Sequence, residues 1–257
     1  MLAYTTGQLE AWVAQGFFPF ARIGACIMVA PVFGARFVPV RTRIILAVAL
    51  TALVVPLLPT PDIAPFSPQG FVALFQQLLI GVALGFALQV VFDALALAGQ
   101  LLANSMGLSF AFNVDPLRGS STPALGQLYV ILATLTFLAL GGHLALIEML
   151  VAGLYTMPVG VTGLGSQGLW ALVLWGGTLF SGAISIALPG VTALLIVNLA
   201  FGVVSRAAPS LNLFAVGFPV SLVIGLLVIL AGIAPLQASF IELLAKGFEF
   251  LRTLGGS

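Results

Sequence analysis

The chain has 257 residues, of which 61% are apolar and 6% are charged, with 8 Lys+Arg, 7 Asp+Glu and one His. Soluble domains average about 45–50% apolar and about 25% charged residues, so this composition predicts a membrane protein. The formal net charge of +1 leaves no basic patch for nucleic acid, and the single cysteine, Cys26, excludes a disulfide framework and a cysteine-based metal site.

Long apolar runs separated by proline, glycine and charge predict an all-α integral membrane protein with a single membrane domain. The expected helical segments number about six: 9–33, 42–58, 70–107, 124–155, 168–204 and 212–234. Three of them exceed 30 residues, and about 35 helical residues extend about 50 Å, against a hydrocarbon core of about 30 Å. The long segments should therefore tilt, protrude or break, with breaks expected at Gly141-Gly142, Gly176-Gly177, Pro189-Gly190 and Pro219. We expect them to pack on other protein subunits.

The loops after the first, third and fifth segments carry arginine, whereas those after the second and fourth carry no base. Five of the eight basic residues lie in these loops: Arg36, Arg41, Arg43, Arg118 and Arg206. The positive-inside rule then predicts a cytoplasmic side for these loops and an outside N-terminus.

The tail, residues 236–254, is expected to form an amphipathic helix. Its apolar face comprises Leu236, Phe240, Leu244, Phe248 and Leu251, and its polar face Gln237, Glu242, Lys246 and Glu249. This helix would lie at the membrane interface or dock on a partner.

A polar stripe runs along the third segment, where Gln89, Asp93, Gln100 and Asn104 share an arc of about 60° on one helix face. Two interpretations stay open: hydrogen bonds between helices, or the lining of a water-filled path. Arg22 of the first segment is the natural candidate to neutralise Asp93.

No catalytic, cofactor-binding or metal-binding motif is present in the sequence, which has no HExxH, no GxSxG and no glycine-rich phosphate loop followed by Lys. We therefore expect a protein that is not an enzyme and has no cofactor. His143 is expected to be a packing or helix-end residue, and Ser181 and Ser185 are expected to bond backbone carbonyls.

Four stretches are similar to one known family. They are PVFGARFVPVRTRIILAVALTALVVPLLP (31–59), MGLSFAFNVDP (106–116), LYTMPVG (154–160) and NLAFGVVSRAAPSLNLFAVGFP (198–219). Together they resemble the FliR family of flagellar export-gate proteins, whose counterpart in virulence type III secretion is the SctT family. The most specific block comprises Arg206, Pro209, Asn212, Phe214, Gly217 and Pro219. The LYTMPVG match favours the flagellar family.

The resemblance implies a subunit of the flagellar type III protein-export gate, in the bacterial inner membrane at the flagellar basal body. In this family the helices pack as hairpins in an assembly raised towards the periplasm. The implied partners are FliP-like and FliQ-like subunits in a helical hetero-oligomer, FlhB-like and FlhA-like components, unfolded flagellar substrates and membrane lipid. A FliP-like front would cover about 1–165 and a FliQ-like back about 166–235, followed by the amphipathic tail 236–257.

The resemblance also implies a plug loop in the export channel. Its residues would be Met106, Gly107, Phe110, Phe112 and Asn113, flanked by the anchors Asp115 and Arg118. Phe110 occupies the family's aromatic plug position. Relatives often place a second aromatic residue directly before Val-Asp-Pro, where this chain has Asn113, so either Phe110 or Phe112 could reach the pore axis. Apolar rings on a loop can block ions by dewetting.

Alternatives to the gate remain. The two rings would otherwise simply pack against helices. A stand-alone secondary transporter would also use broken helices and a mid-membrane Asp. An intramembrane hydrolase would depend on Ser181, Ser185 or His143.

Overall fold

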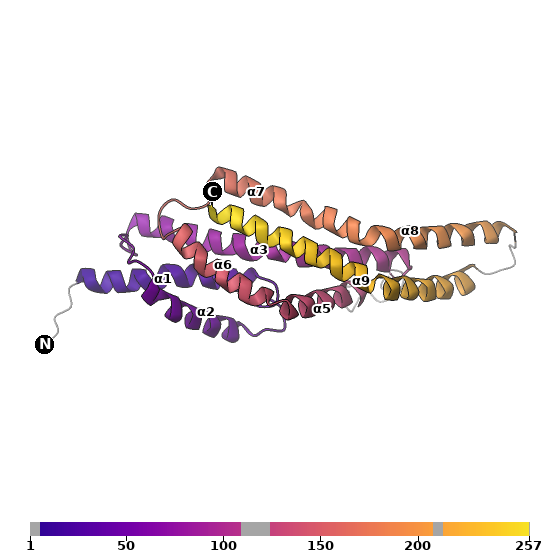
Figure 1. The fold of residues 1–257 in the computed structure, drawn as a ribbon, viewed down its shortest axis with the longest axis horizontal. Helices are drawn as coiled ribbons and strands as arrows, with labels where there is room; N and C mark the ends of the chain where they lie inside the picture. Colours follow the sequence, from indigo (N-terminus) through magenta and orange to yellow (C-terminus); the bar gives the residue numbers. More distant parts are fainter. Residues whose placement is uncertain (1–5, 109–123, 208–212, 257) are drawn as a thin grey trace. The chain divides into compact units, whose positions relative to one another are not determined.

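The computed structural model describes residues 6–108, 124–207 and 213–256, and the regular structure in these ranges is helical throughout. The helices are α1 (Thr6–Val29), α2 (Val40–Val54) with the 3-10 turn η1 (Val55–Leu57), α3 (Pro68–Ser105), α5 (Ala124–Ala139), α6 (Gly142–Thr156), α7 (Ser166–Gly176), α8 (Thr178–Ala207) and α9 (Leu213–Gly256) (Figure 1). In the described ranges five helices are long and apolar enough to cross a membrane, or six if α5 and α6 form one broken span. The expected all-α membrane fold is confirmed.

Helix α3 begins at a clear N-terminal signal. Ser67 precedes Pro68, and its hydroxyl accepts a hydrogen bond from the Gly70 amide at 3.0 Å. A serine cap followed by proline at the first helical position is a typical helix start. The helix extends over 38 residues, which corresponds to about 57 Å at 1.5 Å per residue. It is therefore longer than the hydrocarbon core, as the sequence predicts.

Two of the four expected breaks are confirmed. Gly141, with φ of 72°, separates α5 from α6, and α7 ends at Gly176 just before α8 begins. Pro189 and Pro219, in contrast, lie inside α8 and α9, so the expectation of a break there is wrong. A proline removes one backbone donor, and a long helix packed against neighbours tolerates this loss.

The last helix also joins two segments that the sequence separates. α9 continues through Pro235 for 44 residues, so the sixth segment and the amphipathic tail form one helix. In the tail, the expected apolar face is buried at Leu236, Phe240, Leu244 and Leu251. This face packs on helices of the same chain: Phe240 meets Phe92 edge-on at a ring distance of 5.5 Å.

The chain divides into two compact units. The first comprises Met1–Val90, Phe137–Gly176 and Lys246–Ser257, and the second comprises Val91–Thr136 and Gly177–Ala245. In the first unit, α1 and α3 approach so closely that a Cβ at Gly85 would lie 2.8 Å from the Cys26 carbonyl oxygen. In the second unit, a Cβ at Gly99 of α3 would lie 2.8 Å from the Gly126 Cα of α5. Glycine thus sets the helix spacing in each unit.

Much apolar surface is left uncovered by the chain itself. On α8, large side chains are exposed along most of the helix, including Leu188, Leu195, Ile196, Leu199 and Val203. Continuous apolar surface of this kind is stable only against lipid or other protein subunits.

Candidate functional site

Arg22 is the largest fully buried side chain among the described residues, with no exposed surface. Its Nε donates a hydrogen bond to Gln77 Oε1 at 2.7 Å, which joins α1 to α3. Its two terminal nitrogens donate to the Gly153 carbonyl at 2.7 Å and the Met157 carbonyl at 2.6 Å. These carbonyls lie at the C-terminal end of α6, where unpaired carbonyls and the helix dipole favour a cation. Arg22 therefore fixes three segments of the first unit to one another.

All three of these acceptors are uncharged, whereas the sequence suggests the Asp93 carboxylate as the partner of Arg22. Asp93 is half-buried and belongs to the second unit. The ion pair between Arg22 and Asp93 stays a prediction. Gln77, which orients the guanidinium, is completely buried and was not singled out in the sequence, because the Gln76-Gln77 pair in an apolar run carries no signal for its partner.

The side chains of the polar stripe become more exposed towards the C-terminus of α3. Gln89 and Asp93 are half-buried, whereas Gln100 and Asn104 are exposed. The exposed end lies next to the C-terminus of α3, from which the segment 109–123 continues. Both interpretations of the stripe stay open, as contacts between helices or as the lining of a path.

The C-terminus of α3 ends in a tight motif centred on Gly107. This residue has φ of 79°, a left-handed conformation that favours glycine. Its amide donates to the Asn104 carbonyl at 3.0 Å, and the Leu108 amide donates to the Ala103 carbonyl at 3.0 Å. This pair of bonds defines a Schellman motif, which stops the helix and turns the chain. Gly107 thus fixes where the expected plug loop begins.

At the end of α3, two side chains pack over glycines of α8 and α9 in the second unit. Met106 is buried and lies over Gly225 of α9, where an added Cβ would lie 2.6 Å from Met106 Cγ. One turn earlier, Leu102 lies over Gly190 of α8, where an added Cβ would lie 2.5 Å from Leu102 Cδ2. Both side chains fill space that only glycine leaves free.

Two hydrogen bonds in series also connect α9 and α8 to the end of α3. Asn198 of α8 donates from Nδ2 to the Ser105 carbonyl at 3.3 Å, one of the last carbonyls of α3. The Ser221 hydroxyl of α9, a buried residue, donates to Asn198 Oδ1 at 3.2 Å. We call Leu102, Ser105, Met106, Gly190, Asn198, Ser221 and Gly225 the loop platform. Apart from Met106, none of these residues was predicted from the sequence to support the loop, although Asn198 and Ser221 lie on either side of the family block at 206–219.

Several expected site residues lie outside the described residues. They are Phe110, Phe112, Asn113, Asp115, Arg118, Pro209 and Asn212. In the family block, Gly217 is buried and Arg206 and Pro219 are exposed, while Phe214 belongs to α9 but its side chain is outside the described part. The plug and anchor roles therefore stay predictions.

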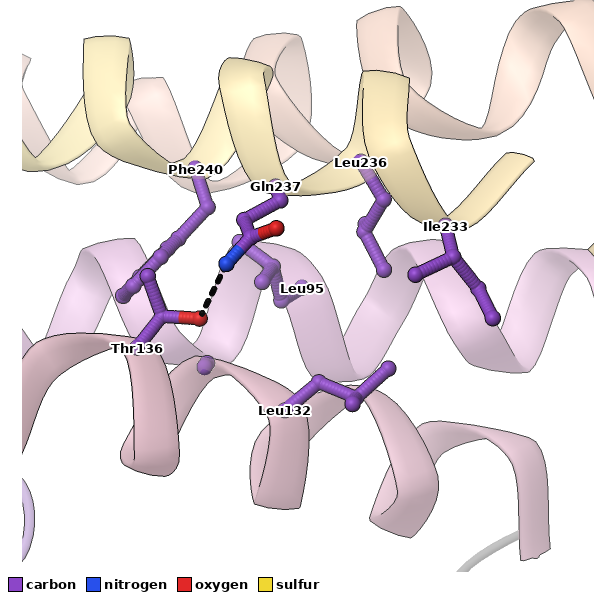
Figure 2. Close-up of a pocket in the computed structure, with 8 residues that line it drawn as sticks. Leu95, Leu132, Thr136, Ile233, Leu236, Gln237 and Phe240 are labelled. Atoms are coloured by element: carbon purple, nitrogen blue, oxygen red, sulfur yellow. Dashed lines mark hydrogen bonds between the residues drawn. The ribbon is translucent and has the colours of Figure 1, made fainter. Parts of the chain in front are cut away.

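A small pocket of about 70 Å³ lies between α5 and α9 in the second unit, with Leu95 of α3 at its back (Figure 2). Gln237 reaches from α9 towards α5 and donates to Thr136 Oγ1 at 3.4 Å (Figure 2). Leu132, Leu236 and Phe240 also line it, so a single polar contact sits among apolar groups. At 3.4 Å this hydrogen bond is long and therefore weak, so the pocket is held mainly by apolar packing.

Ser181 and His143 are two of the residues on which an intramembrane hydrolase would depend. The Ser181 hydroxyl donates to the Gly177 and Thr178 carbonyls, both at 3.4 Å, as expected for a serine bonding its own helix. His143 Nδ1 is buried without a hydrogen-bond partner among the described residues. Within the same part of the chain, no cluster of three metal-ligating side chains occurs.

Comparison with known proteins gives a consistent result. The family described as "Bacterial export proteins, family 1" matches residues 13–247. The chain is 40% identical to the "Flagellar biosynthetic protein FliR" of Pectobacterium carotovorum subsp. carotovorum, over 98% of this chain and 96% of that protein. It is 40% identical to the protein of the same name from Escherichia coli (strain K12), over 94% and 92% of the two chains. For the Bacillus subtilis (strain 168) protein the identity is 26%, over 91% and 92%. The chain belongs to family 1 of the bacterial export proteins.

Proposed function

We propose that this chain is the FliR-type subunit of the flagellar type III export gate in the bacterial inner membrane. The observation that carries this proposal is the near full-length similarity to flagellar FliR proteins at 40% identity. The long uncovered apolar faces, such as that of α8, fit a subunit that packs against other subunits and lipid. The relatives named above are flagellar, which supports a flagellar rather than a virulence system.

In this proposal the chain contributes to a channel for unfolded flagellar subunits and has a structural rather than an enzymatic role. It assembles with FliP-like and FliQ-like subunits, as a FliP-like front over about 1–165 and a FliQ-like back over about 166–235, and it contacts FlhB-like and FlhA-like components. The assembly is raised towards the periplasm. Five to six apolar helices in the described residues agree with a membrane subunit.

The proposed function is tested by complementation. Expression of this chain in a bacterium that lacks its own FliR should restore the secretion of hook and filament proteins, and affinity purification should recover FliP-like and FliQ-like subunits with it. A stand-alone transporter would instead purify alone or as a small homo-oligomer. Absence of both secretion and co-purified subunits, despite normal amounts of the chain in the membrane, would contradict the proposal.

We further infer that the loop starting at Gly107 plugs the channel through Phe110 or Phe112. The loop platform supports this role because a plug needs a fixed point of departure. Met106 and Leu102 pack over glycines of α9 and α8, and the Schellman motif sets the direction of the chain at Gly107.

Replacing both Phe110 and Phe112 by Ala should raise the conductance for small ions across membranes that contain the assembled gate, because smaller side chains no longer exclude water from the constriction. Single replacements should show which ring carries the effect. The measurement is ion leak in cells or proteoliposomes, normalised to the amount of complex. Phe66→Ala, a change at an exposed ring outside the proposed loop, serves as the matched control. Unchanged leak in the double variant would remove the plug role and leave the family assignment intact.

A further inference from the structure

A groove of about 450 Å³ lies along α6 in the first unit, with walls from α3, α6 and the end of α9. Glu148 of α6 and Arg252 of α9 both line this groove, and both are exposed in the single chain. Neither side chain has a hydrogen bond or ion pair with another residue in the described part of the protein. Two opposite charges therefore line one groove without meeting.

The surroundings of Glu148 make this arrangement costly if it stays uncovered in the membrane. The carboxylate lies in the middle of the apolar run HLALIEMLVAGL on α6. A charged side chain in the middle of a membrane helix costs about 2.5–3.5 kcal/mol on insertion scales. Whatever covers this face of α6 should therefore bring a cation or a hydrogen-bond donor to the carboxylate. Glu148 was not among the candidate residues predicted from the sequence, where it is a single carboxylate in an apolar run; only the packing of the helices shows that it is exposed in a groove that Arg252 also lines.

The face of α6 that lines the groove is built from small side chains. Ala145, Ala152 and Thr156 follow one another at spacings of seven and four residues, and all three line the groove. Beside them, a Cβ added at Gly153 would meet no atom within 4 Å. Small residues let the backbone of another helix approach closely in a membrane, whereas an acyl chain has no need of them. The groove thus fits a protein helix better than a lipid tail.

We infer that this groove is the docking site for a helix from another subunit, and that this helix places a Lys or Arg side chain against Glu148. Charge complementarity selects the partner, and the small residues of α6 set the distance of approach. Arg252 on the opposite wall then contacts an acceptor on the same helix. The inference rests on the proposed function only for the source of the helix, which is a neighbouring gate subunit.

The docking is tested in cells that assemble the complete export apparatus. A photoreactive benzoyl-phenylalanine at Met149, a long side chain that lines the groove, should form an adduct with another subunit while the small residues of α6 stay in place. Mass spectrometry should place the adduct on a helix with a Lys or Arg within about one turn, or 3.6 residues, of the linked position. Adducts with phospholipid alone, or with a protein segment that has no basic residue there, would overturn the inference.

Charge variants give a second, independent readout. Glu148→Lys should lower the amount of cross-linked partner recovered with the chain at least about tenfold, because two cations then face each other. Changing the identified Lys or Arg of the partner to Glu should restore recovery. Glu249→Lys reverses an exposed carboxylate of α9 outside the groove and should have no effect.

If Glu148→Lys fails to accumulate in the membrane, Glu148→Gln removes the charge with little change in shape and should still weaken recovery. Normal recovery with Glu148→Gln, or no rescue by any charge exchange, would overturn the inference. Secretion of flagellar proteins is measured in the same strains. A strain that forms the adduct but does not secrete would contradict the proposed function and support the docking site.

Discussion

Replacing Arg22 by Ala is expected to destabilise the first unit by about 3 kcal/mol or more, because it leaves several buried acceptors without a donor, each costing about 1–3 kcal/mol. The affected acceptors are Gln77 Oε1 and the carbonyls of Gly153 and Met157. The end of α6 would then lose its attachment to α1. The measurements are the amount of the chain in membranes and the thermal unfolding midpoint of the purified complex.

Arg22→Lys should rescue this loss only in part. A lysine ammonium is a compact charge, whereas the guanidinium spreads its donors over three acceptors on two different segments. Arg41→Ala is the matched control, because this arginine of the same unit is exposed, lies outside the groove and has no side-chain hydrogen bond to a described residue. Equal midpoints for Arg22→Ala and Arg41→Ala would contradict the role assigned to Arg22.

Introducing a methyl group at Gly81 is the second change with a large expected effect. The Cβ of Gly81→Ala would collide with the Arg22 carbonyl oxygen and lie 2.9 Å from Ala25 Cβ. Both atoms are part of or next to the α1 backbone, so the two helices would have to separate. Overpacking of this kind costs about 1–3 kcal/mol, which should lower the unfolding midpoint of the complex.

Gly24→Ala provides the matched control on α1. A Cβ at Gly24 meets no atom within 4 Å, so this substitution only replaces a poor helix former by a good one. It should leave the midpoint unchanged or raise it, by up to about 1 kcal/mol in stability. If Gly81→Ala were as stable as Gly24→Ala, the close approach of α1 and α3 would not hold in the membrane.

The two changes act on one contact from opposite sides. Gly81 lets α3 lie against the backbone at Arg22, and this proximity brings Gln77, one turn earlier on α3, within 2.7 Å of the guanidinium. Because the residues share a contact, the effects of Arg22→Ala and Gly81→Ala should not add.

The positions of the helices could be predicted from the sequence because their signals are local. Apolar runs and the glycine pairs at 141–142 and 176–177 act on the nearest turns of the backbone, and the structure confirms both. The Ser67-Pro68 start of α3 is a local signal of the same kind, although the segment was expected to begin at residue 70. The prediction of helix breaks at Pro189 and Pro219 was wrong. A proline weakens a helix locally, but the energy that decides whether the helix continues comes from the packing of whole helices.

The sequence by itself determined that this is a helical membrane protein of the export family, with its few polar groups on helix faces. Only the tertiary structure decided what those groups meet. Arg22 finds acceptors 55, 131 and 135 residues away, and Asn198 bonds a carbonyl 93 residues away. Glu148 remains exposed beside a groove. Periodicity states which face of a helix a residue occupies, whereas its partner depends on the order in which all helices pack, which no local signal encodes.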